Sequence, residues 1–295
     1  MHDDELQKHR APAIWFRRQT GKRSLSRLGG LPTLPPGIDW PRQRQTDTPL
    51  HFLAQVDLSH LPPTPLEKTR RGPALPKSGL LFFFADMVEE MLWGANGGPF
   101  ATTRVIFTDR GGAEREPPED IPDVLHAFGE MNRGYNTGIK VFPDASLEPH
   151  VIDTFGGIET WPSPDDSYAA ATQSAMVASI ERAIGPLPVF EGPSAGSAIK
   201  AAEPREYIIL GKYEGKVTRE LRCPRHQMLG VGKNIQGTAE EARARGEVLL
   251  LQIDSDLYVH RHFMFCDMGA AQFWIRPRDL ARSRFDRAWA TTEGG

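Results

Sequence analysis

The sequence predicts an α+β fold: β-rich, with mostly antiparallel sheets in two pseudo-repeated halves and a few peripheral helices. Three observations support this class. Short apolar runs of strand length recur along the chain, and 28 glycines and 25 prolines favour many turns over long helices. Two distant segments also resemble each other. With 295 residues, the chain is long enough to bury a substantial core.

The two similar segments share three features in the same order. Each opens with a Leu-Gly pair, at Leu28 and at Leu229, and continues with an apolar strand that contains a Gln and, two residues later, an Asp. A glycine-led apolar strand follows in both, from Gly79 and from Gly269. An ordered triple of this kind indicates a degenerate duplication.

The duplication predicts how the chain is divided. We expect residues 1–160 to form a first β-rich half and residues 205–295 a second. Residues 161–204 should supply a helix and a Gly/Pro/Ser-rich connection between them. The two halves are expected to pack into a single compact unit.

The Gln-x-Asp strands place two polar side chains on one face, because strand side chains alternate. Gln55 and Asp57 share a face in the first half, as Gln252 and Asp254 do in the second. An amide buried without a hydrogen-bond partner costs ~1–3 kcal/mol. The expected partner is backbone from a neighbouring loop, and the alternative is a ligand between the halves.

Seven segments read as strands, because β-branched and aromatic runs are bounded there by turn residues. The predicted strands are 51–57, 79–85, 103–108, 139–142, 206–212, 248–254 and 270–275.

Three segments are predicted to be helical. Residues 164–184 form the longest helix, because Ser163 can cap it, Pro164 fits the first turn and Gly185 ends it. Thr238-Ala-Glu-Glu is a capping box that starts a short helix. The last helix covers roughly 278–289. Its inward-facing residues are expected to be Leu280, Phe285 and Trp289.

Several motifs are similar to those of a known family. They are Leu28-Gly-Gly-Leu-Pro-Thr-Leu-Pro35, Trp40-Pro41, Phe52-Leu-Ala-Gln-Val-Asp-Leu58, His226-Gln-Met-Leu-Gly230, Leu250-Leu-Gln-Ile-Asp-Ser-Asp256 and Asp267-Met-Gly269. On these motifs the chain resembles the YwqG-like family of uncharacterised bacterial proteins, over residues 24–94 and 225–290. The resemblance implies a two-part β-rich fold with no agreed activity and no catalytic residues to carry over. Val231-Gly232 departs from the Pro-containing turn that is more usual there.

The charge of the chain is unevenly distributed. Its formal net charge is −3, which argues against a protein held to nucleic acid by its overall field. Residues 1–45 hold nine Lys/Arg against four acids, whereas residues 109–166 hold thirteen acids against four Lys/Arg. The ordinary interpretation is two solvated faces, and the alternative is internal docking or a charged partner.

Sequence features that bear on location favour the cytoplasm. No run of ~18 apolar residues is present, so a membrane span is not expected. The acidic residues after His2 do not form a secretory signal. Because Cys223 and Cys266 are the two cysteines, a disulfide framework is not expected either.

Three carboxylates form the strongest candidate site. Asp254 and Asp256 end a predicted strand, and Asp267 precedes the next one. In an antiparallel pair these side chains would converge at one sheet edge and suit a divalent cation or a cationic ligand. The ordinary alternative is capping of turns through backbone amides, and acid–base catalysis is the third possibility.

Other motifs give weaker signals. Ser194 lies in a Gly-x-Ser-x-Gly match to the nucleophile elbow, but too few residues follow for the helix that this motif requires. Trp93 and Phe100 would either line a pocket or cover the sheet. A zinc site is weighed against ordinary core and surface roles for Cys223, His226, His260, His262 and Cys266.

The sequence therefore predicts a non-enzymatic cytoplasmic module that binds an unknown small molecule or protein, with no cofactor, no metal, no nucleic acid and no membrane. The alternative is a metal-dependent hydrolase-type enzyme. The predicted ligand-binding residues are Asp254, Asp256, Asp267, Gln252 and Gln55.

Overall fold

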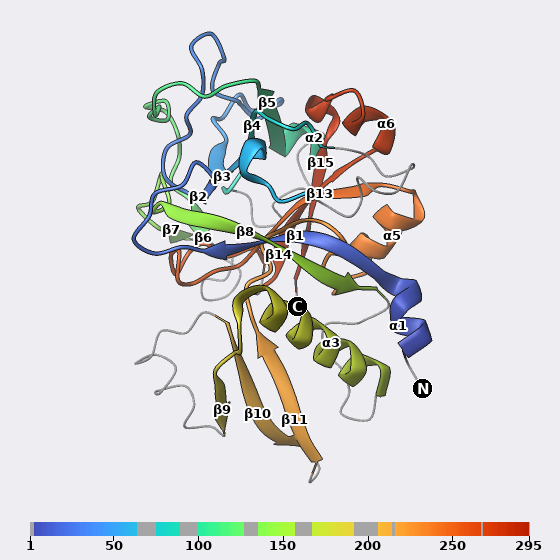
Figure 1. Cartoon of the computed structure of the whole chain (residues 1–295). Coiled ribbons are helices and arrows are strands. Elements are labelled where there is room, and N and C mark those ends of the chain that lie inside the picture. The colour runs from blue at the N-terminus through green and yellow to red at the C-terminus, as the bar shows by residue number, and fades with distance from the viewer. Residues whose placement is uncertain are drawn as a thin grey trace.

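β-strands dominate the protein, as Figure 1 shows. The computed structural model describes residues 3–63, 75–88, 99–126, 135–156, 167–191, 206–213, 216–266 and 268–294. These residues form a ten-stranded antiparallel sheet, a three-stranded sheet and a two-stranded sheet. The described strand pairs are antiparallel except for one parallel pair in the three-stranded sheet. The predicted β-rich, mostly antiparallel α+β class is therefore confirmed.

The ten-stranded sheet brings the two ends of the chain into one ladder. In spatial order its strands are β15 (Trp289–Glu293), β14 (Ala270–Ile275), β13 (Val248–Asp254), β12 (Gln227–Leu229), β1 (Arg10–Arg18), β8 (Ala145–Phe155), β2 (Arg27–Leu28), β3 (His51–Asp57), β4 (Leu80–Ala85) and β5 (Thr103–Thr108). β1 and β8 thus lie in the middle, with four strands on each side.

Two small sheets and several short helices surround this ladder. The three-stranded sheet has the order β11 (Lys216–Arg222), β10 (Tyr207–Tyr213), β9 (Val189–Glu191), and the two-stranded sheet pairs β6 (Leu125–His126) with β7 (Tyr135–Asn136). The helical segments are α1 (Asp3–His9), η1 (Leu58–His60), α2 (Pro99–Thr102), α3 (Ser167–Ile184), α5 (Thr238–Ala244), α6 (Pro277–Leu280) and η4 (Phe285–Arg287). None of these described helices has the length and apolarity needed to cross a membrane.

β1 is buried on both faces because its side chains alternate between two cores. Ile14 and Phe16 enter the largest apolar cluster. Ala13 and Trp15 point the other way and pack with Ile180 of α3 in a second cluster. α3 therefore covers the central strands, and its position below them is visible in Figure 1.

The sheet has two flanks beside the central strands β1 and β8: the first flank is β2 to β5, and the second flank is β12 to β15. The largest core joins these two flanks. Phe83 of β4 contacts Phe273 of β14, with 5.1 Å between ring centroids, and Phe107 lies at the same distance from Phe285. The edge strand β5 also contacts the opposite edge strand β15. The sheet is thus curled, and strands from the beginning and the end of the chain enclose one apolar interior.

Each flank also has a covered outer face. On β3 and β4, Phe52 and Phe84 pack under Trp40 from the preceding loop. On β13 and β14, Leu249 and Trp274 pack under α5. Strands in both flanks are therefore buried on two sides, which explains why they appear in the sequence as continuous apolar runs.

The two predicted Gly-led strands begin where a neighbouring strand passes closely. A Cβ at Gly79 would collide with backbone of Thr108 on β5, and one at Gly269 would collide with backbone of Glu293 on β15. A side chain at either position would push an edge strand out of the ladder. This requirement explains why both strands begin with glycine.

Several predicted elements match the structure, and others are corrected. The strands expected at 51–57, 103–108, 248–254 and 270–275 have those bounds, and 79–85 and 206–212 correspond to β4 and β10. Residues 139–142 are not a strand. The pattern there belongs to a loop that enters β8, which the sequence did not indicate, and β1 was not predicted either.

The helix expected over 278–289 is also wrong. α6 ends at Leu280, Ser283 adopts a left-handed conformation with φ 53°, and the chain continues through η4 into β15. Leu280 and Phe285 are buried as expected, but Trp289 pairs with Trp274 in the ladder. The open edge of β14 captures this segment, because ladder hydrogen bonds outweigh local helix propensity.

The other two predicted helices are present with different ends. α3 occupies Ser167–Ile184, while the proposed cap at residues 163–164 lies outside the described residues. α5 starts at Thr238, but the expected capping box is wrong. Gly237, with φ 89°, is the N-cap residue. The hydroxyl of Thr238 donates a hydrogen bond to Glu293 instead of accepting one from a backbone amide. The boundaries expected for the two halves stay a prediction.

Candidate functional site

The two glutamines of the Gln-x-Asp strands are fully buried and bonded to backbone. Gln55 accepts a hydrogen bond from the Thr33 amide at 3.0 Å and donates to the Leu25 carbonyl at 2.9 Å. Gln252 accepts from the Lys233 amide at 2.8 Å and donates to the Arg225 carbonyl at 3.0 Å. Each amide thus joins its strand to the loop of its own flank.

Asp254 lies next to Gln252 in a dense polar cluster. Its carboxylate accepts hydrogen bonds from the Arg225 amide at 2.8 Å and the Gln252 amide group at 2.9 Å, and Lys233 Nζ lies 2.7 Å away. Burial alone would raise the pKa of Asp254. The charges of Lys233 and Arg225 outweigh burial and hold this pKa below its usual value.

Asp256 is joined to the same cluster through His226. Nδ1 of His226 accepts the Asp254 backbone amide at 3.2 Å, so Nε2 carries the proton and donates to the Asp256 carboxylate at 3.3 Å. Asp256 also accepts the Tyr258 amide at 2.9 Å, and Arg18 lies 3.5 Å away. Burial raises the pKa of Asp256, but His226 and Arg18 more than compensate and lower it.

The structure brings Asp254 and Asp256 together but fills their hydrogen-bonding capacity from within the protein. Asp267 lies outside the described residues. At the end of β3, Asp57 accepts hydrogen bonds from the amide and the hydroxyl of Ser59, which is a turn role. A ligand-binding role for the five predicted residues stays a prediction.

The weaker sequence candidates are also placed in part. Among the residues that the structure describes, no group of three or more His, Cys, Asp or Glu side chains is arranged to hold a metal ion. Cys223 and Cys266 are free thiols, and burial raises the pKa of Cys223. Ser194 and Trp93 lie outside the described residues.

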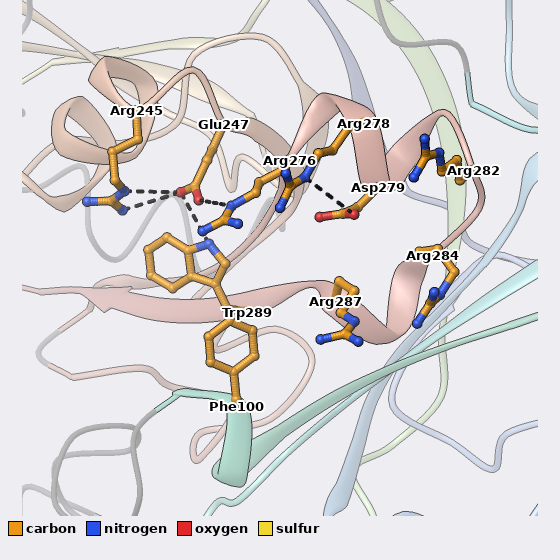
Figure 2. Close-up of a pocket in the computed structure, with 10 residues that line it drawn as sticks. All are labelled: Phe100, Arg245, Glu247, Arg276, Arg278, Asp279, Arg282, Arg284, Arg287 and Trp289. Atoms are coloured by element: carbon orange, nitrogen blue, oxygen red, sulfur yellow. Dashed lines mark hydrogen bonds and ion pairs between the residues drawn. The ribbon is translucent and has the colours of Figure 1, made fainter.

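A different site is formed where the two edges of the curled sheet approach each other. A pocket of about 620 Å³ lies between α6, η4 and β15 on one side and α2 on the other. Figure 2 shows the side chains that surround it. They are Phe100, Arg245, Glu247, Arg276, Arg278, Asp279, Arg282, Arg284, Arg287 and Trp289.

Buried anchors in the segment 276–287 turn its arginines outward. Pro277 opens α6, and the side chains of Leu280 and Phe285 are 1% exposed, so they fix the segment to the core. The arginine side chains between and beside these anchors stay largely exposed, at 68% for Arg278 and 64% for Arg287. Anchoring therefore gives the pocket a wall of guanidinium groups.

The pocket is strongly positive. Six arginines against Glu247 and Asp279 leave a formal charge of +4 on its lining residues. Glu247 is engaged, because it accepts from Trp289 Nε1 at 3.2 Å and from Arg245 at 3.3 Å. Within the described part of the chain, no acidic side chain forms an ion pair with Arg282.

A second hollow of about 460 Å³ adjoins the pocket. It is lined by Arg44, Phe100, Asp286 and Arg287, so Phe100 and Arg287 border both spaces. Arg284 binds Asp286 through two hydrogen bonds of 2.9 and 2.8 Å, and these lower the pKa of Asp286. Arg44, in the loop before β3, and Phe100, on α2, belong to the part of the chain that forms the first flank. Both flanks therefore contribute to the site.

Sequence reasoning missed this pocket although one signal was present. Residues 276–287 contain five arginines and two aspartates. When charge is averaged over longer stretches of the chain, this cluster is diluted. The sequence left Phe100 open between lining a pocket and covering the sheet. It borders this pocket, where its aromatic neighbour is Trp289.

Comparison with known proteins places the chain in a family. A search of curated proteins gave no significant match. Residues 26–293 match the family model described as "Domain of unknown function (DUF1963)". Because this match spans most of the 295 residues, the chain belongs to the DUF1963 family.

Proposed function

We propose that the protein is a non-enzymatic binding module that holds an anionic ligand in the arginine-lined pocket. One observation carries this proposal: a space of about 620 Å³ with six arginines and two carboxylates on its walls. Arginine suits such a role, because its planar group binds carboxylates and phosphates through paired hydrogen bonds and stays charged. The volume falls in the range typical of small-molecule sites.

The composition of the walls favours binding over catalysis. Among the described lining residues there is no Ser, Cys, His or Lys to act as nucleophile or general base, and the carboxyl groups present are those of Glu247 and Asp279. The carboxylate of Glu247 is held by Trp289 and Arg245 and is 5% exposed. These residues suit holding charge better than moving protons.

Three further expectations belong to the same proposal. An internal duplication is supported by the matching backbone bonds of Gln55 and Gln252 and by the matching positions of Gly79 and Gly269. Its two halves would then meet at the pocket. We also propose that the protein is YwqG-like and resides in the cytoplasm.

Titration calorimetry with inorganic tripolyphosphate tests the anion site. The wild-type protein should bind this probe, and the affinity should fall steeply as salt rises, because the interaction is electrostatic. The double variant Arg282→Glu/Arg287→Glu should bind at least about tenfold more weakly, since two attractive charges become repulsive. Both residues are exposed, so the fold should be kept.

The matched control is the double variant Arg219→Glu/Arg222→Glu, because both arginines are exposed on β11 in the separate three-stranded sheet. It also replaces two arginines by two glutamates, but away from the pocket, and should leave affinity unchanged. If wild-type protein does not bind tripolyphosphate at low salt, the proposed function is wrong. Equal weakening by the control would show a general charge effect and would also contradict it.

A further inference from the structure

We propose that the anionic ligand is a nucleoside phosphate, with its base against the aromatic wall of the pocket and its phosphates against the arginine wall. This inference rests on the proposed function and adds a chemical class to it. The pocket combines an exposed aromatic side chain, a fixed indole and several available guanidinium groups. Stacking platforms beside cationic groups are how proteins hold bases and phosphates together.

The aromatic wall is formed by Phe100 and Trp289. Phe100 is 46% exposed although it is a large apolar residue, and it borders both hollows. Trp289 is held in place, because its Nε1 donates to Glu247 and the Arg245 guanidinium lies over its ring at 5.2 Å. Because the Arg245 guanidinium already lies over this indole, the exposed ring of Phe100 is the face left for a base to stack on.

In Figure 2, Arg278 and Arg282 lie on the side of α6, away from Phe100, whereas Arg287 lies nearer to Phe100. Arg282 has no ion pair with a described acid, and Arg278 approaches Asp279 no closer than 3.8 Å. Arg287 approaches Asp286 at 3.6 Å, with both side chains exposed. These groups can turn to phosphate oxygens without breaking a short hydrogen bond.

The charge of the pocket indicates more than one phosphate. A single phosphate monoester carries about two negative charges, whereas the pocket lining carries +4. The shared borders at Phe100 and Arg287 make the two hollows neighbours, so a base and a phosphate chain can occupy separate compartments. We therefore expect affinity to rise from the nucleoside monophosphate to the triphosphate.

Calorimetry with three probes tests the ligand class. Adenosine triphosphate, tripolyphosphate and adenosine are titrated into the full chain at low salt without divalent cations. Adenosine triphosphate should bind at least about tenfold tighter than tripolyphosphate, because base stacking adds to the phosphate contacts. Adenosine alone should bind weakly.

Variants separate the two walls. Phe100→Ala should weaken adenosine triphosphate binding about tenfold and change tripolyphosphate binding less than about twofold. Phe100→Leu keeps the apolar bulk but removes the aromatic ring, so it should lose most of the affinity that base stacking adds. Val217→Ala is the control, because Val217 is 65% exposed on β11 and truncating it should change neither affinity. Circular dichroism confirms that each variant is folded.

The outcomes distinguish this inference from the proposed function. Equal binding of adenosine triphosphate and tripolyphosphate would overturn the nucleoside phosphate and leave the anion site standing. Equal losses of both probes in Phe100→Ala would do the same. If no probe binds, both proposals fall.

Discussion

A buried imidazole illustrates how single residues set the pH response of this fold. The side chain of His51 is 1% exposed, and its Nε2 donates to the Pro122 carbonyl at 2.9 Å. Among the described residues, none hydrogen-bonds to Nδ1. Burial lowers the pKa of His51 to about 4, because a protonated ring would be a charge inside the core.

This pKa predicts that acid destabilises the protein in a defined window. Between pH 6.5 and 4, His51 is protonated in the unfolded chain but stays neutral in the folded protein. The free energy of unfolding therefore falls as pH falls. The loss from pH 7 to 4.5 should be about 2 kcal/mol. Urea denaturation of wild type and His51→Gln at both pH values measures it. If the variant loses as much as wild type, His51 is not the cause.

We expect the carboxylates of the two Gln-x-Asp strands, Asp254 and Asp57, to contribute differently to stability. Asp254→Ala leaves Lys233 and the Arg225 amide without their buried acceptor, so the free energy of unfolding should fall by about 2–3 kcal/mol. Asp57→Ala removes a turn contact to Ser59 and should cost about 1 kcal/mol. Denaturant titration compares them. An unchanged stability of Asp254→Ala, together with lost ligand binding, would favour the ligand role that the sequence predicts.

At the scale of elements, α5 depends on a side chain from the last strand. Glu293 on β15 is fully buried, and it accepts the amides of Ile235, Gln236 and Ala239 and the hydroxyl of Thr238. A carboxylate bonded to several amides at a helix start is a strong cap. The loop, the helix and the edge strand are therefore one cooperative unit.

Glu293→Gln should loosen that unit. The amide keeps one acceptor oxygen and turns an NH₂ group toward backbone donors, so the free energy of unfolding should fall by about 3 kcal/mol. Hydrogen exchange should accelerate first in the amides at the start of α5. Glu240→Gln, at an exposed position of the same helix, is the control. Exchange that is unchanged in α5 would contradict the capping role.

The elements also show what local sequence can predict. β3 and β13 were predicted to the residue, because each is a mainly apolar run of strand length that ends at an aspartate. β1 begins Arg-Ala-Pro and ends with two arginines, and β8 contains Pro149 within its apolar pattern. Both are strands because they complete each other's ladder, which no local pattern reports.

At the scale of the molecule, the two flanks are expected to unfold together. Phe83 and Phe273 meet across the interior from β4 and β14, so each supports the opposite flank. Phe83→Ala and Phe273→Ala should each lower the free energy of unfolding by about 3–5 kcal/mol. The double variant should show a coupling energy of about 0.5–1.5 kcal/mol. Two separate transitions, or strict additivity, would show that the flanks are independent.

The pocket could not be predicted from the sequence, because its walls come from segments that are far apart in the chain. Arg44 and Phe100 are far in the chain from Arg287, and they meet it because the curled sheet brings β5 against β15. The sequence does contain the basic segment 276–287. What it lacks is any local sign of which surface that segment faces.

The central position of β1 has a consequence for how the protein is made. Its ladder partner β12 lies more than 200 residues further along the chain. Synthesis from Phe155 to Gln227 takes roughly 4 to 14 seconds at ~5–20 residues per second, and during this time one edge of β1 has no partner. Such distant pairing also slows folding. The nascent chain therefore exposes an apolar strand edge long enough for chaperones to bind it or for neighbouring chains to aggregate.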